Sequence, residues 1–200
     1  MADGMREHGW YPASNYTDIP TNGAFGHEGY KTISYEIQEQ LGRTPDLVSI
    51  PTAFGEGLFG IWKGFDELTR LGRGGAVPRL VACEPAGGPL LVAMQEPDQP
   101  LARVPRAATV ARGIGGAVNS YISVAALRSC DGTVAQADDK AILDAQRSLA
   151  TEGFLVEPAS AAALAGLRGL AHEGRLPEGQ SIVLVSTSSG LKNFQAPQAV

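Results

Sequence analysis

Residues 47–68 read LVSIPTAFGEGLFGIWKGFDEL, and this stretch decides the fold. Its first five residues form a short apolar run, which predicts a buried strand. A turn with glycines at positions 55, 57 and 60 follows, and residues 58–71 then show the pattern of a helix. A helix that begins directly after a glycine turn points its unpaired N–H groups into that turn. We therefore expect the turn to hold an anion, such as the phosphate of a small molecule.

The segments on either side of this stretch alternate between apolar runs and amphipathic runs. The residues Ile33, Ile37 and Leu41 recur every four positions, which predicts a helix with this stripe in the core over 29–41, ended by Gly42. Buried strands are also expected at 79–84 and 182–186, and a short strand at 132–137. Helices are expected at 90–95, 120–128, 138–151 and 157–171. Strands that alternate with helices predict an α/β fold, in which a parallel sheet is flanked by helices in three layers.

The composition suits a folded domain and argues against several kinds of partner. Of the 200 residues 44% are hydrophobic and 18% are charged, which is enough for a buried core. The net charge of −5 and the lack of a basic stripe argue against nucleic acid. No apolar run reaches membrane-spanning length, and no secretory signal opens the chain, so we expect a cytoplasmic protein. The two cysteines, Cys83 and Cys130, are expected to be reduced thiols, and the three histidines lack metal-ligand spacing.

The glycine turn has two further interpretations that the residues alone leave open. Gly55, Gly57 and Gly60 formally match the GxGxxG pattern of a dinucleotide site, and Glu84 ends the next strand, where such a site has an acidic residue. This interpretation makes the chain a nucleotide-binding oxidoreductase. Alternatively, the glycines only close a strand-to-helix turn. A non-catalytic binding or assembly module is a further class of function that stays open.

A third interpretation explains four motifs together. In chain order they are GYKTISYEIQEQLG from position 29, PDLVSIPTAFGEGLFGIWKGFDEL from 45, EGFLVEPASAAALAGLRGL from 152 and VLVSTSSGLKN from 183. This series closely resembles the C-terminal half of threonine synthases, which belong to the tryptophan synthase beta superfamily, the fold type II pyridoxal-phosphate enzymes. The resemblance extends over positions 9–193.

The resemblance implies a cofactor, a chemistry and a domain organisation. It implies pyridoxal 5′-phosphate, an amino-acid substrate, and β- or γ-elimination or replacement of the lyase or synthase type. Residues 29–200 would form the C-terminal half of the α/β large domain, which is then incomplete, and residues 1–28 an irregular N-terminal segment. The helix start at EPASAAA would be scaffolding.

The resemblance also assigns the cofactor-binding residues. The phosphate-binding turn falls on Ala53, Phe54, Gly55, Glu56 and Gly57. The residue that faces the pyridine nitrogen falls on Thr187. A neutral hydroxyl there would leave the ring nitrogen unprotonated or weakly polarised, which suits elimination and replacement.

The chain departs from the family at the catalytic lysine. Those enzymes carry the cofactor on a Schiff-base lysine within a Ser-Phe-Lys type motif of the N-terminal half, and this chain contains no such motif. Its four lysines, Lys31, Lys63, Lys140 and Lys192, match ordinary positions, so no catalytic residue is assigned. We expect either a homo-oligomer or a second chain that supplies the N-terminal half. An amputated sheet would expose an apolar edge.

Overall fold

The computed structural model describes residues 2–10, 26–106 and 108–193. Its elements are, in chain order, α1 (Ala2–His8), α2 (Gly26–Leu41), β1 (Leu47–Pro51), α3 (Glu56–Arg70), β2 (Arg79–Pro85), α4 (Pro89–Gln95), the 3-10 helix η1 (Arg112–Ile114), α5 (Tyr121–Ser129), β3 (Thr133–Ala137), α6 (Asp139–Thr151), α7 (Pro158–His172), β4 (Ile182–Leu184) and the 3-10 helix η2 (Gly190–Asn193).

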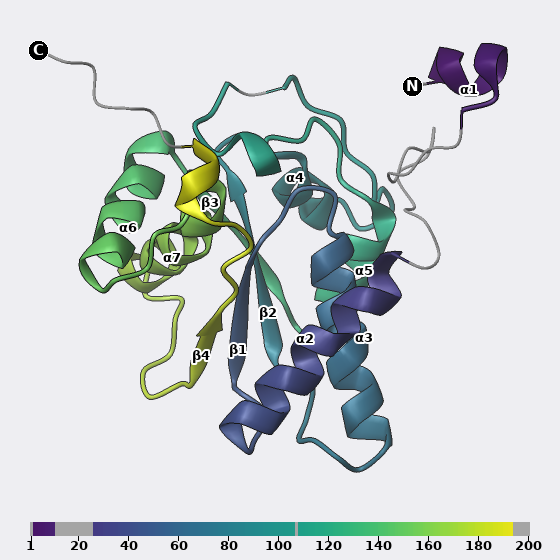
Figure 1. Ribbon diagram of the computed structural model, residues 1–200. Helices are drawn as coiled ribbons and strands as arrows, with labels where there is room; N and C mark the ends of the chain where they lie inside the picture. Colours follow the sequence, from purple (N-terminus) through teal and green to yellow (C-terminus); the bar gives the residue numbers. More distant parts are fainter. Residues whose placement is uncertain (1, 11–25, 107, 194–200) are drawn as a thin grey trace, which may run out of the picture.

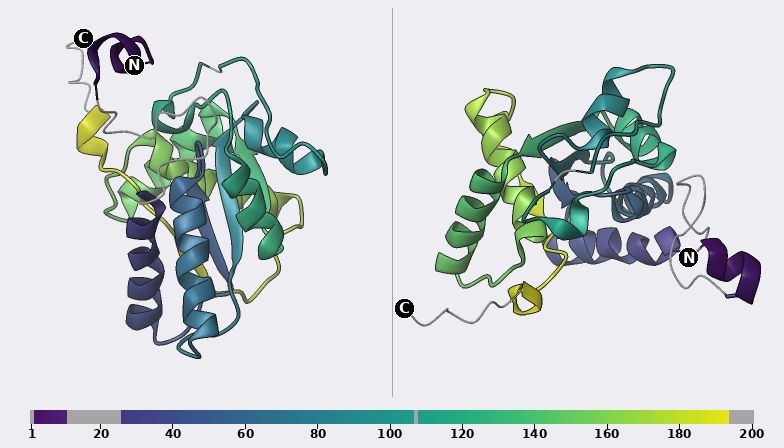
Figure 2. Two further views of the ribbon diagram at one scale, coloured as in Figure 1. Left: turned by 90° about the vertical axis from the view of Figure 1, so that its right-hand side faces the viewer. Right: turned by 90° about the horizontal axis from the view of Figure 1, so that it is seen from above.

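The four strands form one parallel sheet in the order β3-β2-β1-β4. Helices α6 and α7 cover one face, whereas α2, α3, α4 and α5 cover the other (Figures 1 and 2). This arrangement confirms the predicted three-layer α/β fold with a parallel sheet. The carboxyl ends of β1 and β2 lie beside the start of α3, which places the glycine turn at that edge of the sheet.

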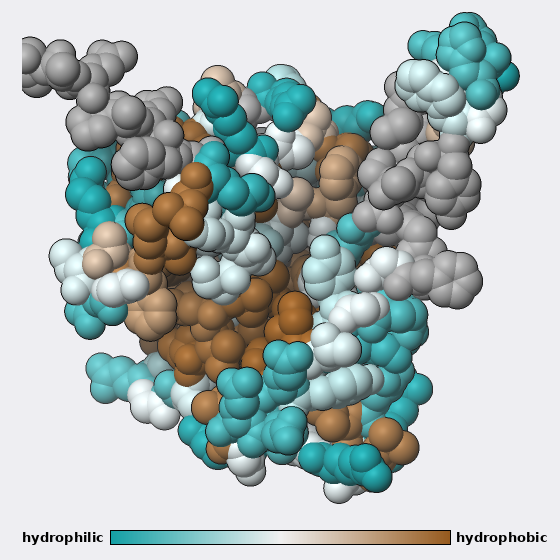
Figure 3. All heavy atoms as spheres, in the orientation of Figure 1, coloured by the Kyte–Doolittle hydropathy of each residue, from teal (hydrophilic) through white to brown (hydrophobic). Residues whose placement is uncertain are grey.

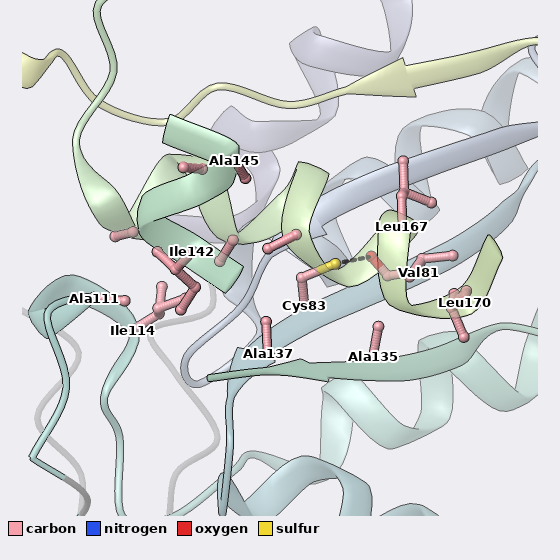
Figure 4. Close-up of a cluster of buried hydrophobic side chains, with 14 of the residues drawn as sticks. Val81, Cys83, Ala111, Ile114, Ala135, Ala137, Ile142, Ala145, Leu167 and Leu170 are labelled. Atoms are coloured by element: carbon pink, nitrogen blue, oxygen red, sulfur yellow. Dashed lines mark hydrogen bonds between the residues drawn. The ribbon is translucent and has the colours of Figure 1, made fainter. Parts of the chain in front are cut away.

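Both faces of the central strands are buried, because their side chains alternate between two apolar clusters. Leu47, Val81 and Cys83 belong to the cluster on the side of α6 and α7, and Figure 4 labels Val81 and Cys83 within it. Val48 and Leu80 point toward α3, α4 and α5. A continuous apolar run, and not an alternating one, is therefore the expected sequence pattern for these strands.

Helix α7 lies close to the sheet because small residues face it. A Cβ atom added to Gly166 would lie only 2.6 Å from Cys83 Sγ and 2.9 Å from Ala135 Cβ. Burial in this contact raises the pKa of the Cys83 thiol to about 12, and both cysteines are free. Cys83 is therefore a core residue and not a reactive thiol.

The N-terminal part of the chain differs from the expected irregular segment. Ala2–His8 is helical, and α2 begins at Gly26, three residues before the predicted start. The glycines and aromatics that suggested irregular structure lie mostly at positions 11–25, outside the described residues. The division at residue 28 therefore remains a prediction.

Two expectations of burial were wrong in part. Within the stripe of α2, Ile33 and Ile37 are half-buried and pack against the core as expected, whereas Leu41 at the end of the helix is 49% exposed. Strand β4 was expected to be buried, yet Ile182 and Leu184 are 37% and 38% exposed. Its one partner strand in the described part of the chain is β1, so its outer edge is bare.

The surface around β4 is strongly apolar. Figure 3 shows hydrophobic atoms gathered over β4 and the hollow beside it. Leu149, Phe154, Leu164 and Leu184 line an apolar groove of about 170 Å³ between this strand and helices α6 and α7. Phe154 is 61% exposed at its margin. The sheet therefore ends in the kind of surface that proteins normally cover.

Candidate cofactor-phosphate site

A cavity of about 280 Å³ opens where β1 ends and α3 begins. Its lining includes all six residues that the resemblance assigned to cofactor binding: Ala53, Phe54, Gly55, Glu56, Gly57 and Thr187. The turn and Thr187 are far apart in sequence, and they meet here because β4 lies parallel to β1. The structure thus brings the predicted residues to one cavity.

Gly55 makes the sharp turn between β1 and α3. Its φ of +96° lies in the left-handed region that favours glycine, and a Cβ there would overlap Ser123 of α5. Ser120 binds the carbonyl of Phe54 through both its hydroxyl and its N–H. Helix α5 therefore holds the turn in place.

The first turn of α3 leaves its N–H groups free. In the described chain, no backbone or side-chain acceptor binds the N–H of Gly55, Glu56, Gly57 or Leu58. Such unpaired donors at the start of a 15-residue helix attract an anion, because the helix dipole adds to their partial charges. The donors line the cavity.

Gly57 leaves room beside these donors. A Cβ at this position would meet no described atom nearer than Tyr30 Cδ1 at 3.9 Å, so none of these neighbours requires a glycine there. Its missing side chain instead keeps the cavity open against the backbone. The free donors and this open space fit a phosphate group.

Glu56 is the one acidic residue of the turn. Burial raises the pKa of its carboxyl, and its Oε1 atom is buried without a hydrogen-bond partner among the described residues. A carboxylate in this position opposes an anion by repulsion, so it weakens the site whenever it is ionised.

Thr187 is held from behind by Ser160 of α7. Their hydroxyl oxygens are 3.1 Å apart, and the Ser160 hydroxyl also accepts the Ser188 N–H at 2.8 Å. Ser160 is 3% exposed, whereas Thr187 is exposed toward the cavity. The family resemblance implied only a scaffolding role for the EPASAAA motif. A lone serine in an alanine-rich helix gives no signal of which residue it will contact.

Sequence reasoning also missed the part of the lining that comes from α2 and η1. Tyr30 and Ile33 close one side of the cavity, and Gly113 and Ile114 close another. They are ordinary helix and loop residues in the sequence, and only tertiary packing brings them to the turn.

The four lysines all fall within the described ranges, and none of them lines this cavity. Lys31 pairs with Glu28 and Glu67, and Lys63 pairs with Glu28, which ties α2 to α3. Lys140 pairs with Asp144 within α6. These three lysines therefore form ion pairs on the surface of the helices, away from the cavity.

The features that favoured a dinucleotide site have structural explanations. A Cβ on Gly60 would lie 2.6 Å from the His27 carbonyl, so this glycine serves the close contact of α3 with α2. The Glu84 carboxylate is 2% exposed and accepts the N–H groups of Leu90 and Leu91 at 3.0 and 2.9 Å. It caps α4 and does not face the cavity, so the oxidoreductase interpretation is not favoured.

Two further searches cover the described ranges. Within them, no three His, Cys, Asp or Glu side chains are grouped as metal ligands would be. No helix there combines the length and apolar character needed to cross a membrane.

Known proteins resemble this chain in sequence and in fold. The family model of the pyridoxal-phosphate dependent enzymes matches residues 2–188. Threonine synthase of Synechocystis sp. is 36% identical over 167 residues, and threonine synthase of Methanocaldococcus jannaschii is 34% identical over 177. The crystal structure of a T.th. threonine deaminase superposes with a TM-score of 0.67 at 24% identity.

The chain spans less than half the length of its threonine synthase relatives. The two alignments include 83% and 86% of this chain but only 42% and 44% of those enzymes. The threonine deaminase alignment covers 85% of this chain and 55% of that one. This chain therefore corresponds to about the C-terminal half of such an enzyme.

Proposed function

The chain belongs to the pyridoxal-phosphate dependent enzymes, and from this premise we propose that it forms the cofactor-phosphate half of a threonine-synthase-type active site. The observation that carries the proposal is the joining of a donor-rich, open glycine turn and Thr187 in one cavity. The reaction would be elimination or replacement at the β- or γ-carbon of an amino acid, for which bound pyridoxal phosphate supplies an electron sink.

Each residue of the site has a distinct part in this proposal. The N–H groups of Gly55, Glu56 and Gly57 would hold the cofactor's 5′-phosphate, together with the turn residues Ala53 and Phe54. The Thr187 hydroxyl would meet the pyridine nitrogen. These residues bind and orient, and none of them is placed to move the substrate's α-proton. Proton transfer therefore requires a lysine from outside the cavity's present lining.

We propose that this lysine arrives with a polypeptide that docks on β4. Ile182 and Leu184 present side chains there, and the free backbone groups of the strand can pair with a further parallel strand. The relatives contain more than half of their length outside the matched region, which is enough to complete the sheet. We also propose that the reaction is of the lyase type and that the protein is cytoplasmic.

The test is a titration of the purified chain with pyridoxal phosphate, followed by borohydride reduction and peptide mapping. We expect protection against heating by the phosphorylated cofactor but not by pyridoxal, which lacks the phosphate. We expect no single lysine of this chain to be trapped. Equal protection by both compounds would contradict a phosphate cradle.

A second arm adds the N-terminal half of the Synechocystis sp. threonine synthase as a separate chain. The proposal expects a complex in which borohydride traps the cofactor on a lysine of the added chain. Trapping on one of the four lysines of this chain would show that it has its own cofactor-bearing residue and would overturn the two-chain arrangement.

A further inference from the structure

We propose that the Tyr30 hydroxyl of α2 is a further phosphate-binding group, which donates a hydrogen bond to the anion held at the start of α3. The inference rests on the proposed function, because the anion would be the cofactor's 5′-phosphate. It gives α2 a part in ligand binding, in addition to its packing on α3.

Helices α2 and α3 lie side by side and run in the same direction (Figures 1 and 2). Near their starts, a Cβ atom added to Gly60 would lie 2.5 Å from Tyr30 Cβ. Further along both helices, the Tyr35 hydroxyl donates to the Glu67 carboxylate. The side chains of a helix tilt toward its N-terminus. The Tyr30 ring therefore tilts toward the start of α3, where the unpaired N–H groups are.

The contacts of the ring agree with this direction. Its Cδ1 and Cε1 atoms lie 3.9 and 4.0 Å from the position that a Cβ atom would take on Gly57. Gly57 precedes Gly60 by about one helical turn, so the ring extends along α3 from its second turn to its first. The hydroxyl is at the far end of the ring. It is therefore carried toward the free N–H groups of the turn, and Tyr30 is part of the cavity lining.

The site has few other side chains that could bind an anion. The described residues that line the cavity include no lysine, arginine or histidine, and Glu56 is acidic. Three of them carry a hydroxyl: Tyr30, Thr52 and Thr187. Thr52 donates its proton to the Ile50 carbonyl at 2.9 Å, and the proposed function gives Thr187 to the pyridine nitrogen. The Tyr30 hydroxyl is therefore the side-chain donor that remains for the phosphate.

The experiment measures the affinities of inorganic phosphate and of pyridoxine 5′-phosphate, which has no aldehyde to react with lysines. Wild type is compared by calorimetry with Tyr30→Phe, which removes only the hydroxyl oxygen. Tyr35→Phe is the control, because Tyr35 lies on the same helix outside the cavity lining and donates to Glu67 at 2.5 Å. The melting temperature of each unliganded variant shows whether the substitution acts on the fold.

We expect Tyr30→Phe to bind both ligands roughly threefold to tenfold more weakly than wild type, at an unchanged melting temperature. Tyr35→Phe should melt at a lower temperature and bind both ligands as wild type does. Equal affinities of Tyr30→Phe and wild type, or a loss confined to pyridoxine phosphate, would overturn the inference. Absence of binding of both ligands to wild type would instead overturn the proposed function itself.

Discussion

Two glycines of the turn between β1 and α3, two positions apart, have different physical roles. Gly55 is required by the backbone, because its φ is positive and α5 packs against it. Gly57 has helical neighbours and open space, so none of its described neighbours needs it to be small. The glycine pattern in the sequence predicted the turn but did not separate these roles.

Replacing Gly57 by alanine should therefore uncouple stability from binding. We expect Gly57→Ala to stabilise the unliganded chain by about 0.5–1 kcal/mol, because alanine favours the helix over glycine and meets no clash. Affinity for pyridoxal phosphate should fall at least several-fold. Thermal melts with and without the cofactor measure both effects.

Gly169→Ala is the matched control for this variant. Gly169 lies in α7 with no described atom within 4 Å of an added Cβ, so it should give the same gain in stability without any change in affinity. If Gly57→Ala binds the cofactor as tightly as wild type does, the phosphate does not bind at this position.

Glu56 provides a pH-dependent test of the same turn. Burial raises the pKa of its carboxyl above the ordinary value of 4.5, so ionisation of Glu56 destabilises the fold at neutral pH. This cost is fully present above the raised folded pKa and vanishes as pH falls below 4.5. We expect Glu56→Gln to melt at a higher temperature at pH 7 and at the same temperature as wild type at pH 4.

The same substitution should also strengthen phosphate binding. Loss of the negative charge is expected to raise affinity for inorganic phosphate roughly threefold to tenfold at pH 7, and less at high ionic strength. Calorimetry in low and high salt measures this effect. A Glu56→Gln affinity equal to wild type in low salt would mean that the phosphate does not bind near this carboxylate.

Among the elements, helices α2 and α3 are in close contact through small residues. Gly60 and Gly64 of α3 face α2 one helical turn apart, and a Cβ on Gly64 would lie 2.6 Å from the Lys31 carbonyl. The Ser34 hydroxyl donates to the Ile61 carbonyl within this contact at 2.6 Å. The position of Tyr30 in the cavity lining depends on this packing.

Gly64→Ala should destabilise the chain even though alanine is the better helix former. We expect a loss of roughly 1–3 kcal/mol, which is typical of overpacking a tight contact. Denaturant titration beside Gly169→Ala separates the two effects, because the latter should be as stable as wild type or more so. Equal stability of both variants would show that α2 moves away from α3 at little cost.

The sequence predicted most elements well, because each has a local signal. Strand β1 is found at its predicted bounds, and α6 begins after Asp138, whose side chain accepts the Ala141 N–H as an N-cap should. The prediction that β4 is buried was wrong. An apolar run shows that a strand can bury its side chains, but it does not show whether a neighbouring element covers them. The Ser160 contact has no local signal at all, since its partner is 27 residues away.

For the whole molecule, the surface over β4 should control association. An exposed apolar edge strand pairs readily with other chains, and the purified protein is expected to self-associate as concentration rises. Leu184→Lys should reduce this association, because lysine on an edge strand opposes further pairing. Sedimentation across a concentration series measures the change.

Leu71→Lys is the control for surface charge. Leu71 is 69% exposed beyond the end of α3 and is not part of the β4 surface, so its replacement should leave association unchanged. The same two variants also test the binding of an N-terminal half. We expect Leu184→Lys to weaken this binding and Leu71→Lys to leave it unchanged. A wild-type chain that stays monomeric at every concentration would contradict this use of the edge.

The position of β4 also has a consequence for how the chain folds during synthesis. Strand β4 pairs with β1, and beside this pairing Ser181 donates hydrogen bonds to Asp46. These two residues are 135 positions apart in the sequence. At a translation rate of about 5–20 residues per second, β1 waits on the order of ten seconds for this neighbour. During that interval the nascent sheet has β1 itself as an open edge. Ribosome-associated chaperones are expected to bind this chain until its last strand emerges.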